Sequence, residues 1–313
     1  MTIIGHQSQI RELQSNLQTG NIAHAYLFSG PRNLGKMTVA QWFAGQLLDC
    51  DVSKQLLHPD CLVLDQLWIE RVCTDWEEIG RSSNVPQGHR SKKTKAKTNS
   101  ISIDDVRALQ ECLQTTGIHG KRRVCMIRSV ERMQDTAANA LLKILEEPPE
   151  GYVFLLTTQM LHRLLPTIVS RVRVLHFHRV AKSDLLPLIS GVEEKEQQLL
   201  LHIAQGAPGT MLRLCHMSEE RKRCAVLFAQ AQNVMTARAA DERMRALAPL
   251  EKRGKEADEF FLFLFLALRD IRPGNLVEWE QALRELGENL SLNVHRTLSI
   301  QHFVLKMTPI CCN

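Results

Sequence analysis

The sequence lacks an apolar run long enough to cross a membrane. Its longest, FFLFLFLAL from Phe260 to Leu268, is far shorter than the roughly 20 residues that a spanning helix needs. A helix that is apolar on all sides is typical of the centre of a helical bundle. The stretch MTIIGHQSQIRELQ at the start is polar and amphipathic and does not resemble a secretion signal. These features argue against a membrane or secreted protein and predict a cytoplasmic one.

Paired cysteines are also missing. Nine cysteines are scattered along the chain, and none of them forms a CxxC pair. Tetrahedral zinc sites usually contain such local pairs, and an odd number of cysteines without a secretion signal indicates reduced thiols. We therefore expect neither a disulfide framework nor a structural zinc ion.

The excess of positive charge is small: 39 Lys and Arg stand against 34 Asp and Glu, a net charge of +5. Residues 81–100 are the exception, with six Lys and Arg, no acid and one large apolar residue, Val85. Such a segment buries too little surface to fold alone, so we expect a flexible basic insertion. It could be a DNA-contacting tail or a solvated loop, and it has no aromatic side chain on which bases could stack.

The central motif of the chain runs from Val124 to Gly151. VCMI at its start is typical of a buried parallel strand, and Asp135 is the expected N-cap of the following helix. Pro148 ends that helix, and Tyr152–Thr158 predicts a second apolar strand. One helix face carries apolar side chains at i, i+3, i+4 and i+7: Ala138, Leu141, Leu142 and Leu145.

A phosphate-loop pattern follows the expected strand Ala25–Phe28. Gly30 to Lys36 fits G-x-x-x-x-G-K, but Met37 occupies the position of the Mg²⁺-binding Ser or Thr, and Thr38 is one residue late. The glycines allow backbone N–H groups to face phosphates at the start of the next helix, where Lys36 adds charge. The alternative is a glycine turn with a surface lysine, and whether the loop binds nucleotide stays open.

The acidic residues of P-loop ATPases are missing from the end of the strand at 124–127. Those enzymes place carboxylates there to hold Mg²⁺ and to polarise water, and this chain has Arg128 and Ser129. The pattern therefore predicts the scaffold of a nucleotide motor without its catalytic carboxylates.

The string AANALLKILEEPP resembles the clamp-loader AAA+ family, most closely the delta-prime subunits of the bacterial DNA polymerase III clamp loader. The resemblance extends over nearly the whole chain and is strongest from Met133 to Thr158. It implies an α/β, P-loop NTPase-like (AAA+) parallel-sheet domain at 1–178, a helical lid at 179–220 and a helical collar at 221–313. His58-Pro59-Asp60 resembles a stretch just beyond the family's zinc module, whose loop is missing here.

The resemblance also assigns roles to particular residues. Thr157 stands where the family has its sensor-1 polar residue, and Gly209 stands where active ATPases have a sensor-2 arginine. Ser170-Arg171-Val172 resembles a Ser-Arg-Cys motif whose arginine reaches the ATP of a neighbouring subunit. We expect Arg171 to be this finger, exposed and without an internal partner. The implied degenerate nucleotide site comprises Gly30, Gly35, Lys36, Thr38 and Thr157.

These features predict a catalytically inactive, delta-prime-like clamp-loader subunit that helps to load the sliding clamp onto primed DNA. Its implied partners are gamma/tau-like ATPase and delta-like subunits, with the clamp and primer–template DNA reached through the complex. One alternative is an ATP-hydrolysing, gamma/tau-like motor that uses Thr38 as a Mg²⁺ ligand and Glu131 as base. Another is an AAA+-fold module that binds nucleic acid through residues 81–100.

Overall fold

The computed structural model describes residues 3–50, 58, 60–64, 100–114, 122–292 and 295–308. The chain divides into two compact units. The first comprises residues 1–190 and 204–211, and the second comprises residues 191–203 and 212–313. The expected three-part division at 178 and 220 stays a prediction. Within the described residues, no helix is both long and apolar enough to span a bilayer.

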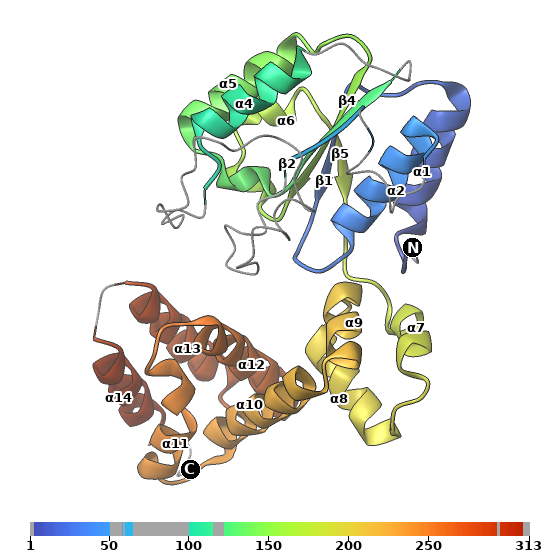
Figure 1. Ribbon diagram of the computed structural model, residues 1–313. Helices are drawn as coiled ribbons and strands as arrows, with labels where there is room; N and C mark the ends of the chain where they lie inside the picture. The colour runs from blue at the N-terminus through green and yellow to red at the C-terminus, as the bar shows by residue number, and fades with distance from the viewer. Residues whose placement is uncertain are drawn as a thin grey trace. The chain divides into compact units, whose positions relative to one another are not determined.

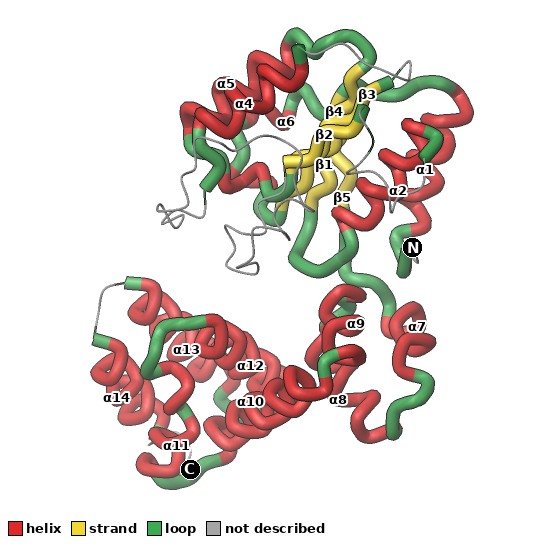
Figure 2. The backbone as a smooth tube through the Cα atoms, viewed as in Figure 1, coloured by secondary structure: helices red, strands yellow, loops and turns green. Residues whose placement is uncertain are grey.

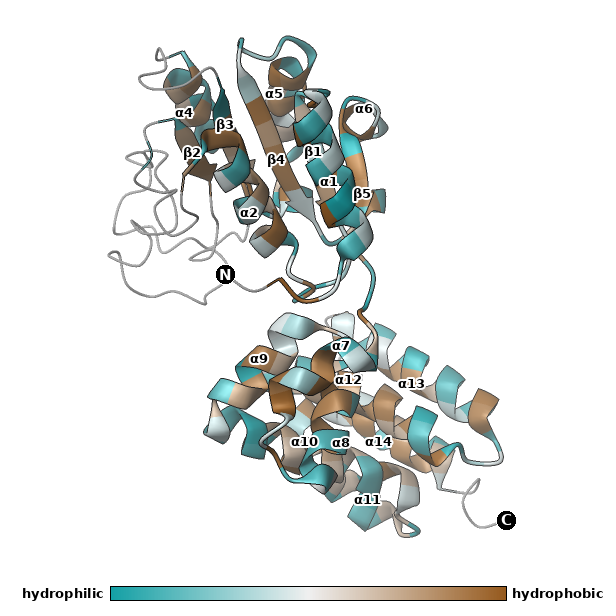
Figure 3. Cartoon of the chain, turned by 90° about the vertical axis from the view of Figure 1, so that its right-hand side faces the viewer, coloured by the Kyte–Doolittle hydropathy of each residue, from teal (hydrophilic) through white to brown (hydrophobic). Residues whose placement is uncertain are grey.

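The first unit is built on a parallel sheet whose five described strands lie in the order β2-β3-β4-β1-β5. This confirms the expected parallel α/β architecture (Figure 1). The strands are β1 (Ala25–Ser29), β2 (Cys61–Leu64), β3 (Arg123–Ile127), β4 (Tyr152–Thr158) and β5 (Arg173–His176). β4 has the predicted bounds, is buried along its whole length and carries mostly hydrophobic residues (Figure 3).

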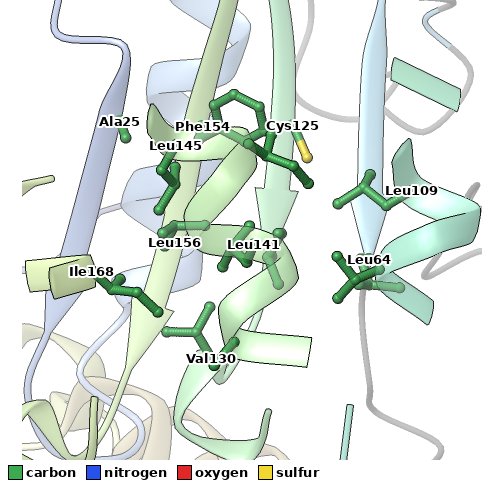
Figure 4. Close-up of a cluster of buried hydrophobic side chains, with 14 of the residues drawn as sticks. Ala25, Leu64, Leu109, Cys125, Val130, Leu141, Leu145, Phe154, Leu156 and Ile168 are labelled. Atoms are coloured by element: carbon green, nitrogen blue, oxygen red, sulfur yellow. The ribbon is translucent and has the colours of Figure 1, made fainter. Parts of the chain in front are cut away.

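Helices cover both faces of the sheet (Figure 2). One face packs against α1 (Gln7–Thr19) and α2 (Lys36–Leu48), and the other against α4 (Ile103–Leu113), α5 (Asp135–Glu146) and α6 (Pro166–Val169). Successive residues of a strand point to opposite faces, so Leu27 joins the α5 side and Phe28 the α2 side. Figure 4 shows the α5 side of this core.

One helix starts with a reciprocal capping contact, and the start of another corrects a sequence prediction. Ser102 accepts a hydrogen bond from the N–H of Asp105, whose carboxylate accepts one from the N–H of Ser102. This is a capping box with Asp in place of Glu. Asp135, by contrast, is the first residue of α5 and not its N-cap, which is Gln134. An acid in the first turn still stabilises the helix through its dipole.

Short helices complete the first unit: η2 (Val130–Arg132), η3 (Leu161–Arg163), α7 (Lys182–Leu185) and η4 (Leu186–Ile189). Parts of α8 (Glu194–Ala204) and α9 (Pro208–His216) belong to each unit. The remaining helices lie in the second unit: α10 (Ser218–Thr236), α11 (Ala240–Ala246), η5 (Ala248–Leu250), α12 (Lys255–Ile271), α13 (Leu276–Ser291) and α14 (Arg296–Met307).

The second unit packs around α12 and a buried arginine. α12 carries the apolar run at 260–268 and contacts α10 and α13; Phe260 and Leu264 are fully buried, whereas Leu262 is exposed. Arg243 has no exposed surface, and its guanidinium donates to the carbonyls of Val234 and Ala237. A buried cation is tolerated only when it is paired in this way.

Candidate functional site

The loop between β1 and α2 is shaped by two glycines with positive φ. Gly30 has φ +150°, and a Cβ there would lie 2.3 Å from the carbonyl oxygen of Phe177, so no side chain fits. Gly35 has φ +89° and caps α2, where its carbonyl accepts from the N–H of Val39 at 2.9 Å. The first N–H groups of α2 therefore point into the loop, the arrangement in which helix starts bind anions.

Lys36 is held inside this loop. Its Nζ donates to the carbonyl oxygens of Gly30 at 2.6 Å and Pro31 at 2.5 Å. Burial lowers the pKa of Lys36 to about 8, a shift that nearby Glu131 opposes and nearby Arg128 reinforces. A phosphate that binds Lys36 must therefore compete with two backbone carbonyls, but it would also relieve the cost of burying the ammonium group.

The next two positions differ from a standard phosphate loop, as the sequence indicates. Met37 packs against the apolar cluster on the α2 side of the sheet and offers no hydroxyl. Thr38 lies beside Gly35, since its Oγ1 would be 4.0 Å from a Cβ at that glycine. Thr38 is therefore close to the loop, and its role as a Mg²⁺ ligand stays a prediction.

The ends of β3 and β4 are joined by the buried side chain of Thr157. Its hydroxyl accepts a hydrogen bond from the N–H of Ser129 at 3.0 Å, and Ser129 has a left-handed φ of +57°. This contact fixes the sharp turn that follows Arg128. Thr157 also pairs in register with Phe28, two residues before Gly30. The structure thus brings Thr157 to the same sheet edge as the phosphate loop.

Glu131 was expected to have a role only in the alternative interpretation, as the base of an ATP-hydrolysing motor. It follows the turn at Ser129 and lies in η2, and its charge acts on Lys36 more strongly than that of Arg128 or Arg32. Its Oε2 is buried and has no hydrogen-bond partner among the described residues. A carboxylate oxygen left in this way can accept a proton or help to hold a cation. A carboxylate a few residues past a strand end was the only signal in the sequence.

The start of α9 contacts the phosphate loop at Asn33. The N–H of Gly209 donates to the carbonyl of Asn33 at 2.8 Å, and Asn33 Nδ2 donates to Thr210 Oγ1 at 3.1 Å. A Cβ at Gly209 would lie 3.0 Å from that carbonyl oxygen. A side chain at position 209 would therefore push this contact apart, which gives a physical reason for glycine there.

His6 contacts the phosphate loop at Leu34, and no motif in the sequence indicated this contact. Its Nε2 lies 2.7 Å from the carbonyl oxygen of Leu34, and its ring lies 4.7 Å from that of Phe177. Burial lowers the pKa of His6, so the neutral ring, which donates to Leu34, is favoured near pH 7.

Arg171 lies in the turn just after α6, and the expectation that it has no internal partner is wrong. Its Nη2 forms an ion pair with Glu146 Oε1 at 2.8 Å, and its Nη1 donates to the carbonyl of Thr167 at 2.9 Å. The side chain is 36% exposed. The pair forms because α5 and α6 pack side by side, a long-range contact that sequence spacing does not reveal.

Two of the three cysteines between residues 50 and 73 fall within the described residues. Burial raises the pKa of the Cys61 thiol to about 12, so its protonated form is favoured near pH 7. Cys50 is free. The third, Cys73, lies outside the described residues, as does the basic insertion at 81–100 except for Ser100. The expectations for zinc and for this insertion stay predictions.

Comparison with known proteins agrees with this geometry. A family model described as "DNA polymerase III, delta subunit" matches residues 5–181. The chain is 28% identical over 309 residues to DNA polymerase III subunit tau of Escherichia coli, covering 96% of this chain and 43% of that protein. It is 33% identical over 176 residues to tau of Salmonella typhimurium, covering 56% of this chain and 24% of that protein. The chain thus spans less than half the length of these relatives.

A solved structure supports the fold. A DNA polymerase III gamma subunit-related protein from Thermotoga maritima superposes with a TM-score of 0.52 at 20% identity, covering 95% of this chain and 98% of that one. The AAA+ P-loop fold expected from the sequence is thereby confirmed.

The expectation of a catalytically inactive subunit is wrong. Relatives that match include gamma and tau subunits, the class that the sequence suggested as an ATP-hydrolysing alternative. That expectation relied on the missing carboxylates at Arg128 and Ser129 and discounted Glu131, which the turn at Ser129 brings close to Lys36. Because the family model covers more than half of the chain, the protein belongs to the DNA polymerase III delta subunit family.

Proposed function

We propose that this chain is a subunit of the DNA polymerase III clamp loader and helps to load the sliding clamp onto primed DNA. The observation that carries the proposal is the family match over residues 5–181, which takes in β1 to β5 and both Lys36 and Arg171. Its partners in this function are gamma/tau-like and delta-like subunits, with the clamp and the primer–template DNA reached through the assembled complex. Residues 179–220 act as a lid, and residues 221–313 act as a collar.

Within the complex, Arg171 serves a neighbouring subunit as an arginine finger, which is a delta-prime-like role. Its partial exposure and its place in the turn just after α6 support this assignment. Arg123 and Arg243 are buried and could not reach another chain. A planar guanidinium suits the task because its fork matches two phosphate oxygens and stabilises the charge that develops in the transition state.

The loop from Gly30 to Lys36 binds the phosphates of a nucleotide, with Gly35 at the start of α2, Thr38 beside it and Thr157 at the adjacent strand end. The anion-binding geometry of α2 and the buried ammonium of Lys36 support this. The donors fit a phosphate well. They fit Mg²⁺ less well, since Met37 brings no hydroxyl and Arg128 is a cation. The carboxylate available near this site is that of Glu131.

A second candidate is hydrolysis of ATP by this chain itself. The buried, unpartnered Oε2 of Glu131 favours it, because this oxygen could accept a proton from an attacking water. Lys36 and the N–H groups of α2 would hold the phosphates in place. Hydrolysis measured on the pure chain and on a Glu131→Gln variant tests this role: the wild-type chain should hydrolyse ATP, and the variant should do so more slowly.

Co-purification tests the main proposal. The chain is mixed with gamma/tau-like and delta-like subunits, and the complex is isolated and tested for clamp loading on primed DNA. The proposal expects one stable complex whose loading activity depends on this chain. No complex with those subunits, together with DNA binding by the chain alone that weakens steeply with salt, would support the nucleic-acid module instead.

A further inference from the structure

Two elements of the chain hold the guanidinium of Arg171. Glu146 lies 2.8 Å from Nη2, while Nη1 donates to the carbonyl of Thr167 at 2.9 Å and to the hydroxyl of Ser170 at 3.3 Å. These contacts occupy both terminal nitrogens of the fork. The same nitrogens are among the donors that an arginine uses to bind phosphate oxygens in pairs.

The position of Glu146 is unfavourable for an acid except as a partner of Arg171. It is the last residue of α5, where the helix dipole is negative, and Glu147 follows it. Both ends of the pair are anchored: Leu145 of α5 and Ile168 of α6 are buried in one apolar cluster (Figure 4). The ion pair therefore joins the last residue of one packed helix to the turn that follows the other.

We propose that Glu146 is a positioning residue. In the free subunit its ion pair keeps Arg171 from binding phosphate, and in the complex this pair breaks so that Arg171 binds the γ-phosphate of a neighbouring subunit. The inference rests on the function proposed for Arg171. A carboxylate at 2.8 Å neutralises the guanidinium and repels an approaching phosphate, so the two anions compete for one cation. Both side chains are more than one third exposed, which makes the pair inexpensive to break.

The test is ATP hydrolysis by the assembled loader that contains Glu146→Gln, which keeps the shape of the side chain and removes its charge. At low salt we expect hydrolysis at the site served by Arg171 to rise about 1.4- to fivefold, the range set by an exposed ion pair, and the rate of the whole loader to rise by less because it has other sites. The gain should shrink as salt is added, because salt screens the wild-type pair. An unchanged or lower rate would overturn the inference.

A matched control is available two residues along the chain. Arg173 Nη2 lies 2.8 Å from Glu12 Oε1, and these side chains are 40% and 38% exposed, against 36% and 41% for Arg171 and Glu146. Glu12→Gln should leave the hydrolysis rate unchanged. Equal acceleration by both variants would mean that any lost surface carboxylate has this effect, and would refute a specific role for Glu146.

An Arg171→Ala background separates this inference from the proposed function. If Arg171→Ala alone leaves hydrolysis unchanged, the finger proposal fails and this inference fails with it. If Arg171→Ala slows hydrolysis but Glu146→Gln does not accelerate it, only the inference fails. If Glu146 acts through Arg171, then Glu146→Gln has no effect once Arg171 is alanine; acceleration there would also overturn the inference.

Discussion

Replacing Gly30 with alanine would place a methyl group where the backbone of Phe177 already lies. The new Cβ would be 2.3 Å from the carbonyl oxygen of Phe177 and 3.1 Å from its carbonyl carbon. Contacts below 3.0 Å essentially do not occur for real Cβ atoms, so the overlap is about 0.7 Å, the difference between 3.0 and 2.3 Å. Either the loop or the strand end must move.

The size of the effect follows from how firmly Phe177 is held. Its N–H donates to the carbonyl of Ser29 at 2.7 Å, and its ring lies 4.7 Å from His6 and 5.7 Å from Phe28. Overpacking in such surroundings costs about 1–3 kcal/mol, and a residue other than glycine at φ +150° adds about 1–3 kcal/mol of strain. We expect Gly30→Ala to destabilise the first unit by about 3–5 kcal/mol.

Urea denaturation measures this cost, with Gly20→Ala as the matched control. Gly20 also has a positive φ, +70°, but no described atom outside its chain neighbours lies within 4 Å of its added Cβ. That variant should lose only about 1–2 kcal/mol of backbone strain. If Gly30→Ala costs no more than Gly20→Ala at an unchanged denaturant slope, the phosphate loop is not packed against Phe177 as we infer.

Two further predictions concern the first unit. Ser102→Ala removes the acceptor for the N–H of Asp105 and should lower the free energy of unfolding by about 1 kcal/mol in urea denaturation, whereas no loss would mean that the capping box contributes nothing. The folded-state pKa of Lys36 is lowered to about 8, so the unfolded chain binds more protons between about pH 8 and pH 10.5 and stability rises across that window. The free energy of unfolding of Lys36→Met, taken relative to that of wild type, should therefore be constant below about pH 8 and fall by about 3 kcal/mol towards pH 10.5. A difference that stays constant across this window would contradict the buried ammonium.

Much of the first unit could be predicted because local patterns determine it. Tyr152–Thr158 is apolar without alternation, which is the signature of a strand buried on both faces, and β4 has these bounds. Gly30 and Gly35 stand at fixed spacing between a strand and a helix, and both have the positive φ that only glycine adopts easily. Ser102 and Asp105 are close in sequence, so their capping box could be read directly.

The remaining features depend on contacts between distant parts of the chain. The ion pair of Arg171 with Glu146 forms only once α5 and α6 pack together. The reason for glycine at position 209 lies in Asn33, and the support for Leu34 comes from His6. Glu131 approaches Lys36 because Ser129 adopts a left-handed turn, a conformation that a non-glycine residue seldom takes.

The central claim is that Arg171 acts on the ATP site of another subunit. The measurement is ATP hydrolysis by the assembled loader with Arg171→Ala and with Arg171→Lys, after assembly of each complex has been confirmed. A finger supplied in trans can be worth about 10³-fold at its own site, but a loader with several sites would slow only severalfold. The account predicts that both variants assemble and that both slow hydrolysis, because an ammonium group cannot replace the planar fork. Wild-type rates from both assembled complexes would contradict it.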